Sequence, residues 1–443
     1  MKIKILENTI NKIKKEGFSA DATISTGRGS SVTIEDKSVK SVKTSQKEGL
    51  SLRLINKDNK IGLSGTNNVN NQEIDKVISD SKEVSEYGQT AKFELPKKAD
   101  KKKIPKTSDA KLGKKDVDDL INEGKKVVEK VYDHKSQMQI ESLDISVASS
   151  NSAFLNTEGL YEEEDRTMLS YSISTQKVKE GDFFQLFQGS SSTQDDIDFE
   201  EEADKLLMKA DWGSKVAKIA SGKYPVVFVP EGVSVLADYI LRNLNGKFTN
   251  EGSSKLKDSI GEKLFDERIS IYDDATLDYY PGSHVVDDEG VVGTKTTLVA
   301  GGKIKNFYYD LQQAAKAGKY STGNGSKGGM FTGVTPGISN VVIGEGDKPY
   351  DELIKNINEG ILGYHFLGAG QNNPFNGDFQ LSTYMGFKIE KGEIVGRLKD
   401  TAISGNVFDL LKNKLLWLSK DRERHGNILA PYVCVDDVVV LSK

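Results

Sequence analysis

The sequence predicts an α+β protein in which helix and antiparallel-sheet units are followed by a β-rich C-terminal domain. Three observations support this fold class. Apolar residues recur at helical spacing near the start of the chain, short alternating runs cover residues 22–64, and residues 222–443 contain many strand-like runs with few helical patterns. Helices and strands are therefore grouped rather than strictly alternating along the chain.

The first unit comprises residues 1–95. One helical face near its start carries four apolar residues, Ile3, Leu6, Ile10 and Ile13. Gly17 follows at the position where a C′ glycine ends a helix. The alternating runs that come next predict an antiparallel meander with a tight turn at residues 56–59, and residues 74–84 predict a second helix on the same layer.

Residues 96–115 form the clearest boundary, because they are Lys-rich, contain two prolines and nearly lack large apolar side chains. We interpret them as a solvated linker rather than a partner-binding arm. The order of helix, strands and helix then recurs in a central unit, residues 116–221, which closes with an acidic helix from about Asp198 to Ile219. The two units share a layout without a residue-level repeat.

Composition limits the classes of function. A length of 443 residues suggests two or three domains, and a net charge of −5 argues against a nucleic-acid binder, which needs clustered Lys and Arg. No apolar run reaches the roughly 18 residues of a membrane span, and the Lys-rich start lacks the apolar core of a signal peptide. The single cysteine, Cys434, excludes an internal disulfide and fits a cytoplasmic protein.

The most specific pattern lies in residues 279–329. It consists of PGS at 281–283, DDEG at 287–290, the run TTLVAGGKIKNFYYD and then STGNG. This order resembles the C-terminal domain of the TldD/PmbA family, also called TldD/TldE peptidases or modulators of DNA gyrase, and the resemblance extends through residues 340–343, 377–379 and 404–407. It implies an α/β N-terminal region, a C-terminal domain of mixed curved sheet over residues 222–443, and dimers.

The resemblance also indicates which branch of the family this chain is similar to. In active members, the helix after the first strand of this domain carries H-E-x-x-x-H, whose histidines bind zinc and whose glutamate activates water. The matching positions here hold Asp238, Tyr239 and Asn243, and none of the chain's four histidines is followed by glutamate. The resemblance therefore implies a TldE/PmbA-like member with no metal or catalytic residue of its own. Zinc is expected only in a TldD-like partner.

Five further residues are candidates for a cleft: His284, Asp287, Asp288, Glu289 and Asp378. An imidazole with carboxylates suits zinc or manganese, but a turn explains the acidic cluster better than a metal site does. Asp378 stands in the family's G-D-F position, where we expect it to cap a turn rather than to fix a loop near the cleft. For Asp273 and Asp274 a solvated turn is the better explanation.

Other motifs carry no chemistry. Residues 323–328 match G-x-G-x-x-G, but the preceding residues look helical and no helix follows, so we reject dinucleotide binding. Neither a P-loop nor a G-x-S-x-G elbow is present. Cys434 lies in the last predicted strand, and we expect a buried core thiol.

The leading hypothesis is a TldE/PmbA-like, non-catalytic subunit of a metallopeptidase complex that acts on unfolded or extended peptides. Its expected partner is a TldD-like, metal-binding subunit, with a homodimer as the other arrangement, and the peptide is held through backbone hydrogen bonds at strand edges. Two alternatives stay open. One is a metal-independent hydrolase that uses Asp, Glu, Ser or Lys side chains in the same cleft, and the other is a non-enzymatic regulatory or binding protein.

Overall fold

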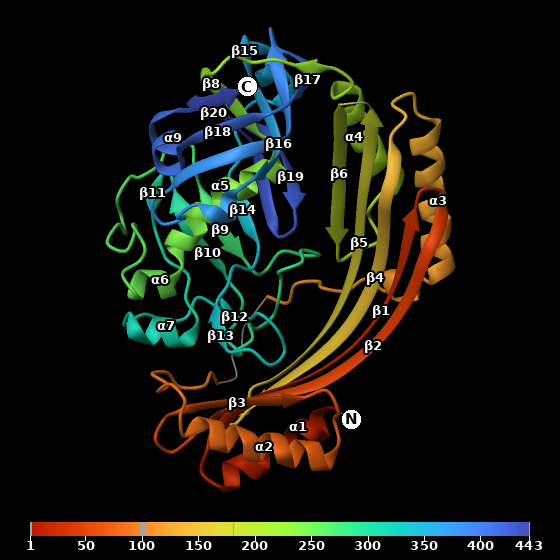
Figure 1. Ribbon diagram of the computed structural model, residues 1–443. Coiled ribbons are helices and arrows are strands. Elements are labelled where there is room, and N and C mark those ends of the chain that lie inside the picture. Colours follow the sequence, from red (N-terminus) through yellow and green to blue (C-terminus); the bar gives the residue numbers. More distant parts are fainter. Residues whose placement is uncertain (1, 98–102, 180, 443) are drawn as a thin grey trace.

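The computed structural model describes residues 2–97, 103–179 and 181–442. A long arched sheet of six strands, in the order β3-β2-β1-β4-β5-β6, curves around a second, larger sheet that belongs to the C-terminal part of the chain (Figure 1). All pairs in the arched sheet are antiparallel. The α+β class and the β-rich C-terminal region are therefore confirmed.

The elements of the arched sheet and its helices are α1 (Lys2–Lys15), β1 (Ser19–Glu35), β2 (Ser38–Ile55), β3 (Ile61–Thr66), α2 (Asn71–Ser85), η1 (Leu112–Lys114), α3 (Val117–Asp133), β4 (Gln139–Asn156), β5 (Tyr161–Lys179), β6 (Asp182–Ser192) and α4 (Phe199–Trp212). The first helix and its end follow the sequence closely, and Gly17 has a φ of 81° as a C′ glycine should. Helix α4 ends at Trp212, short of the expected Ile219.

Two separate helical layers cover the arched sheet. Along β1, Ile24 packs with the apolar faces of α1 and α2, whereas Val32 and Ile34 pack with α3 and α4. The residues of β1 between these two clusters are small or polar. Strands β1 and β4 pair over residues 21–34 of β1, so the segments 1–95 and 116–221 share one sheet.

Residues 103–115 correct our view of the linker. Leu112 is buried in the core beneath α3, and the Thr107 hydroxyl donates to the Asp165 carbonyl at 2.7 Å. The Tyr279 amide donates to the Lys106 carbonyl at 2.7 Å, so this stretch also contacts the C-terminal part. The Lys-rich composition led to the wrong expectation of a solvated segment, while a few spaced residues anchor it. Residues 98–102 of the predicted linker lie outside the described residues.

The C-terminal elements are β7 (Val216–Ala217), β8 (Gly222–Phe228), α5 (Pro230–Leu244), α6 (Gly246–Asn250), β9 (Ile271–Asp274), β10 (Lys295–Ala300), β11 (Lys303–Ile304), α7 (Leu311–Lys316), β12 (Gly325–Lys327), β13 (Val334–Pro336), β14 (Val341–Ile343), α8 (Tyr350–Leu353), η2 (Ile354–Asn356), β15 (Glu359–Leu367), η3 (Ala369–Gln371), β16 (Asp378–Glu390), β17 (Glu393–Leu398), β18 (Thr401–Asn406), α9 (Val407–Asn413), β19 (Leu415–His425) and β20 (Ile428–Ser442).

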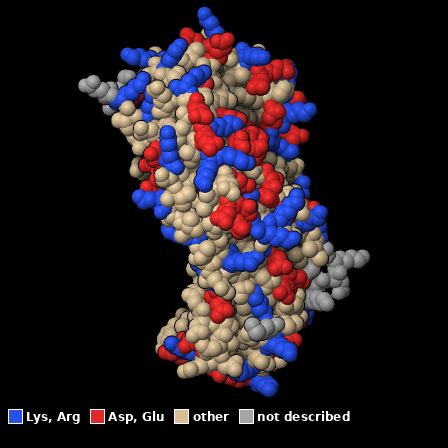
Figure 2. Space-filling model, turned by 90° about the vertical axis from the view of Figure 1, so that its right-hand side faces the viewer, with Lys and Arg blue, Asp and Glu red and all other residues tan. Residues whose placement is uncertain are grey.

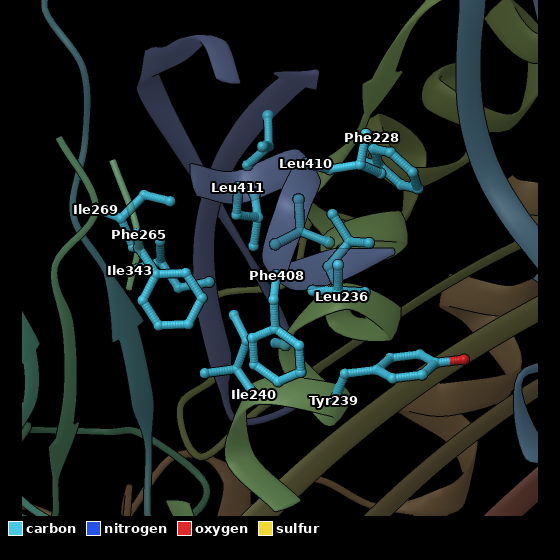
Figure 3. Packing of buried hydrophobic residues seen from close by; sticks show 14 of the residues in the cluster. Phe228, Leu236, Tyr239, Ile240, Phe265, Ile269, Ile343, Phe408, Leu410 and Leu411 are labelled. Atoms are coloured by element: carbon cyan, nitrogen blue, oxygen red, sulfur yellow. The ribbon is translucent and has the colours of Figure 1, made fainter. Parts of the chain in front are cut away.

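The larger sheet is mixed. Strand β20 pairs parallel with β14 and antiparallel with β8, and β8 in turn pairs parallel with β15. Helices α5 and α9 supply much of its core, in which Leu236, Ile240, Phe408 and Leu410 are buried side by side (Figure 3). Cys434 is fully buried in β20, as expected.

No helix among the described residues is long and apolar enough to cross a membrane. On the side of the molecule that carries α3, basic and acidic side chains are interspersed (Figure 2). This mixed pattern agrees with the acidic net charge and does not resemble the basic surface on which nucleic-acid binding depends.

Candidate functional site

A pocket of about 370 Å³ lies where β4 and β5 face the C-terminal part of the chain. Three of the predicted cleft residues, His284, Asp287 and Asp288, line it together with Arg166 of β5. Glu289 is buried next to them and does not line the pocket, and Asp378 is not among its lining residues either. The structure thus brings together most of the acidic turn and the histidine, but not all five candidates.

Asp287 is bound by the backbone. Its carboxylate accepts hydrogen bonds from the amides of Glu289 at 2.9 Å, Val291 at 2.8 Å and Gly325 at 2.7 Å. Burial, followed by the charge of Glu289, raises the pKa of Asp287 well above its usual range, although the backbone donors oppose this rise. A carboxylate that accepts hydrogen bonds from nearby backbone amides in this way closes a turn.

His284 and Asp288 are also held by the backbone. The Nδ1 and Nε2 atoms of His284 lie 3.0 and 3.2 Å from the carbonyl oxygens of Gly282 and Gly323. The exposed Asp288 accepts a hydrogen bond from the Lys327 amide at 2.8 Å. Because both imidazole nitrogens face carbonyl oxygens, this ring is poorly placed to ligate a metal.

Glu289 joins the C-terminal part to the arched sheet. Its Oε1 lies 2.5 Å from Nη1 of Arg53 on β2, and its Oε2 accepts from the Leu311 amide at 2.6 Å. Nε of Arg53 donates to Asp21 of β1 at 2.7 Å, and all three charged side chains are buried. Sequence reasoning missed Arg53 and Asp21. The available signal was a lone charge between apolar neighbours in each strand.

Asp273 and Asp274 contradict the expected solvated turn, because both are buried at the end of β9. Asp273 accepts hydrogen bonds from the Asn324 side chain at 2.5 Å and from the Ser339 amide at 2.8 Å. Burial raises the pKa of Asp273 to about 6, against the effect of these hydrogen bonds. Asp274 accepts from the Thr276 amide at 2.8 Å. Both carboxylates organise loops around the pocket.

The glycine-rich segment forms strand β12 and not the start of a helix. Gly323 adopts a φ of 75°, and β12 pairs with β13. The geometry that a dinucleotide pyrophosphate requires, a strand followed by a helix N-terminus, is therefore not formed at these residues.

Helix α5 begins at Pro230 as predicted and carries the three positions assigned by resemblance to the metal motif. Asp238 is exposed and forms an ion pair with Arg242 at 2.7 Å. Tyr239 is buried beside the apolar cluster, and its hydroxyl points away from that cluster (Figure 3). Burial raises the pKa of Tyr239, so the phenol stays neutral near pH 7.

Asn243 is fully buried and fully hydrogen-bonded. Its Nδ2 donates to the carbonyls of Tyr239 at 2.9 Å and Pro374 at 3.1 Å, and its Oδ1 accepts from the Lys255 amide at 2.8 Å. Together these positions offer one exposed carboxylate, a neutral phenol and an engaged amide. Such a set does not supply the three or four His, Cys or carboxylate ligands by which proteins bind zinc.

Asp378 lies at the start of β16, where its Oδ1 accepts from Nδ2 of Asn406 at 2.8 Å. Asn406 also caps α9 through the Phe408 amide at 3.0 Å. The Asp378 carboxylate thus orients the side chain that caps α9.

A second charged cluster, which the sequence did not reveal, lies near the start of α5. Glu231 Oε1 is 3.5 Å from Nδ1 of His365, and the buried Lys209 donates to Gln188 at 2.6 Å and lies 4.4 Å from the ring centre of Tyr364. Burial lowers the pKa of Lys209 to about 8, an effect that neighbouring carboxylates partly offset. No motif marks these residues, because they come from four separate elements.

Among residues 2–97, 103–179 and 181–442, no three His, Cys, Asp or Glu side chains are grouped so that they could hold a metal ion.

Comparison with known proteins identifies the family. The PmbA/TldA metallopeptidase C-terminal domain matches residues 221–442, domain 1 of the same family matches residues 20–85, and its central domain matches residues 110–224. The chain belongs to the PmbA/TldD family. The resemblance drawn from residues 279–329 is thereby confirmed.

Relatives span the whole chain. An uncharacterized protein of Methanocaldococcus jannaschii is 29% identical over 97% of this chain and 98% of its own length. A metalloprotease of the same organism is 28% identical over 91% of this chain and 90% of its own length. The solved structure of TldE from Thermococcus kodakarensis, at 23% identity, superposes with a TM-score of 0.90 over 99% of this chain and all of that one, which shows a shared fold.

Proposed function

We propose that this protein is the TldE/PmbA-like, non-catalytic subunit of a TldD/TldE-type metallopeptidase complex. One observation carries the proposal. The family membership covers three domains, yet the α5 positions that the resemblance assigns to the metal motif hold an exposed Asp238, a neutral Tyr239 and a fully engaged Asn243. The chain belongs to a peptidase family but has no set of metal ligands on α5, and this combination favours the role of a non-catalytic subunit.

In this proposal a TldD-like partner supplies zinc and the glutamate that activates water. This chain contributes a scaffold and polar surfaces that hold an unfolded or extended peptide. The pocket lined by His284, Asp287 and Asp288 presents backbone groups and polar or charged side chains that can hold a polypeptide. Backbone hydrogen bonds to an extended peptide tolerate many sequences, which suits a complex that acts on unfolded chains.

The test measures cleavage of an unstructured peptide by the pure chain, by a TldD-like subunit from the same cell and by their mixture. We expect no cleavage by the chain alone and chelator-sensitive cleavage that increases in the mixture. Chelator-sensitive cleavage by the chain alone, with contaminating protease excluded, would overturn the proposal. Cleavage by the chain alone that survives chelation would favour the metal-independent hydrolase, and Glu231 with His365 would be the first pair to change.

A further inference from the structure

One long stretch of β2 has a partner strand on only one side. Strand β3 pairs with β2 only over residues 50–55, where Thr66 lies opposite Leu50. Residues 38–48 of β2 pair with β1 on one side and, among the described residues, with no strand on the other. We call residues 38–48 the open edge. At about 3.3 Å per residue it extends for roughly 36 Å.

Burial changes abruptly where β3 ends. All residues of the open edge except Ser41 are exposed, including Val39 and Val42, whereas residues 49–55 are buried. An exposed strand edge presents unpaired backbone N–H and C=O groups, and proteins usually shorten or cover such edges. This one is neither short nor covered by the described residues.

Cations without acidic partners surround the open edge. Lys40 pairs with Glu35 at 3.2 Å, but Lys43 and Lys47 form no ion pair among the described residues. Thr44 and Gln46 line a pocket of about 480 Å³ together with Arg28 and Lys114.

Three cations line that pocket. Arg28 and Lys114 have no carboxylate partner among the described residues, whereas Lys115 pairs with Glu123 at 2.8 Å and with Asp195 at 2.7 Å. Arg28 donates only to neutral groups, the Ser149 hydroxyl at 3.1 Å and the Gly113 carbonyl at 2.8 Å. Asp116 also lines the pocket, but its carboxylate caps α3 by accepting a hydrogen bond from the Asp119 amide. Along the open edge the three lysines, Lys40, Lys43 and Lys47, outnumber its single acidic residue, Glu48, so its net charge is positive.

The positive charge of the open edge indicates which kind of strand can pair with it. A second copy that paired through the same edge would bring lysines against lysines, and like charges opposite each other destabilise a strand pair. A strand that carries Asp or Glu would instead place carboxylates against Lys43 and Lys47, which lie on one face of β2. The lysines thus discourage pairing between copies and favour an acidic partner.

We propose that the open edge of β2 binds an acidic polypeptide segment in extended form, which continues the sheet beside residues 38–48. Backbone hydrogen bonds provide the pairing, and cross-strand contacts with Lys43 and Lys47 select acidic sequences. This proposal rests on the proposed function, because it names the chemical class of the extended peptide that the complex would hold. The test below measures peptide binding without cleavage, so the binding proposal and the proposed function can fail independently.

The experiment measures fluorescence anisotropy of labelled peptides as long as the open edge, with the full chain and no partner. One peptide alternates Thr and Glu, a second has Lys in place of Glu, and a third is the acidic peptide with alternate backbone amides methylated. We expect only the first to bind, with an affinity that falls as salt rises from about 0.05 to 0.3 M. Equal binding of the acidic and basic peptides, or undiminished binding of the methylated one, would refute strand addition to an acidic segment.

Variants locate the site. The double change Lys43→Glu and Lys47→Glu should weaken binding of the acidic peptide at least about tenfold, because two attractive cross-strand pairs become repulsive. The control is Lys303→Glu with Lys305→Glu, two exposed lysines at β11, on an edge of the other sheet. Equal effects of the two double variants would overturn the proposal. So would sedimentation showing a dimer of the chain that blocks the peptide, since the occupant would then be a second copy.

Discussion

Arg53 of β2 and Glu289 of the acidic turn form a buried ion pair that joins the arched sheet to the C-terminal part of the chain. Asp21 of β1 completes the group through Nε of Arg53. Buried charges are tolerated only when they are paired and hydrogen-bonded, so these three residues depend on one another. The acidic turn therefore holds the two sheets together as well as shaping the pocket.

Replacing Arg53 should be costly. We expect Arg53→Met to lower the free energy of unfolding by about 3–5 kcal/mol, because two buried carboxylates lose the cation with which both form an ion pair. Urea denaturation followed by circular dichroism measures the change. Arg242→Met is the matched control, since it breaks an exposed pair one turn apart on α5 and should cost at most about 0.5 kcal/mol. A loss below about 1 kcal/mol for Arg53→Met would show that the pair does not stabilise the fold.

The buried carboxyl group of Asp310 should make the stability of the protein depend on pH. Burial raises the pKa of Asp310 to about 6, and the charge of Glu289 adds to this rise. The hydrogen bond that the Gln313 amide donates to Asp310, the N-cap of α7, lowers the pKa and so opposes the rise. The unfolded residue titrates near pH 3.9, roughly, so the folded protein holds the extra proton between these values. Its stabilising contribution is complete below about pH 4 and is lost as pH rises through about 6.

Asp310→Asn keeps an oxygen for the cap and removes the titration. Relative to the unchanged protein, we expect the variant's free energy of unfolding to rise by up to about 3 kcal/mol between pH 4 and pH 7.5, roughly. Urea denaturation at both pH values measures this difference. A difference that does not vary with pH would contradict the buried, protonated state of Asp310.

Asn243 should matter for stability rather than for metal binding. Asn243→Ala leaves the Lys255 amide and the Pro374 carbonyl without their partner, so we expect a loss of about 2–3 kcal/mol. Asp238→Ala, on the exposed face of the same helix, should cost less than about 0.5 kcal/mol. Thermal and urea denaturation compare the two variants, and equal losses would mean that the buried amide network contributes nothing.

Cys434 should be inert in the folded protein. It is fully buried in β20, and burial raises the pKa of its thiol far above the usual range. We expect no alkylation by iodoacetamide at about pH 8 without denaturant, and complete alkylation in urea. Ser253→Cys, which places a thiol on an exposed loop, is the positive control. Rapid labelling of Cys434 in native buffer would indicate that β20 opens.

Local patterns in the sequence predicted the elements well. Helix α1 with Gly17, helix α5 after Pro230 and the alternating strands of the arched sheet follow from periodicity and capping, which act within a few residues. The family resemblance added the mixed C-terminal sheet. It rested on the order of short motifs that hydrophobic pattern alone does not distinguish.

The buried charges could not be predicted in the same way. Arg53 and Glu289 are 236 residues apart, so no window of sequence relates them. Asp273 resembles a turn residue locally, and its burial depends on Asn324 and Ser339, which lie 51 and 66 residues further on. Such residues become intelligible only once the fold brings distant segments together.

The metal content of the pure protein shows whether this chain or its partner holds the zinc. Mass spectrometry of the chain alone should detect no stoichiometric metal, because the three α5 positions do not fit zinc. After mixing with a TldD-like subunit from the same cell, we expect one zinc per heterodimer together with peptidase activity. Stoichiometric metal retained by the chain alone would rule out a non-catalytic subunit without metal, and His284 with its acidic neighbours would then be the first ligands to change.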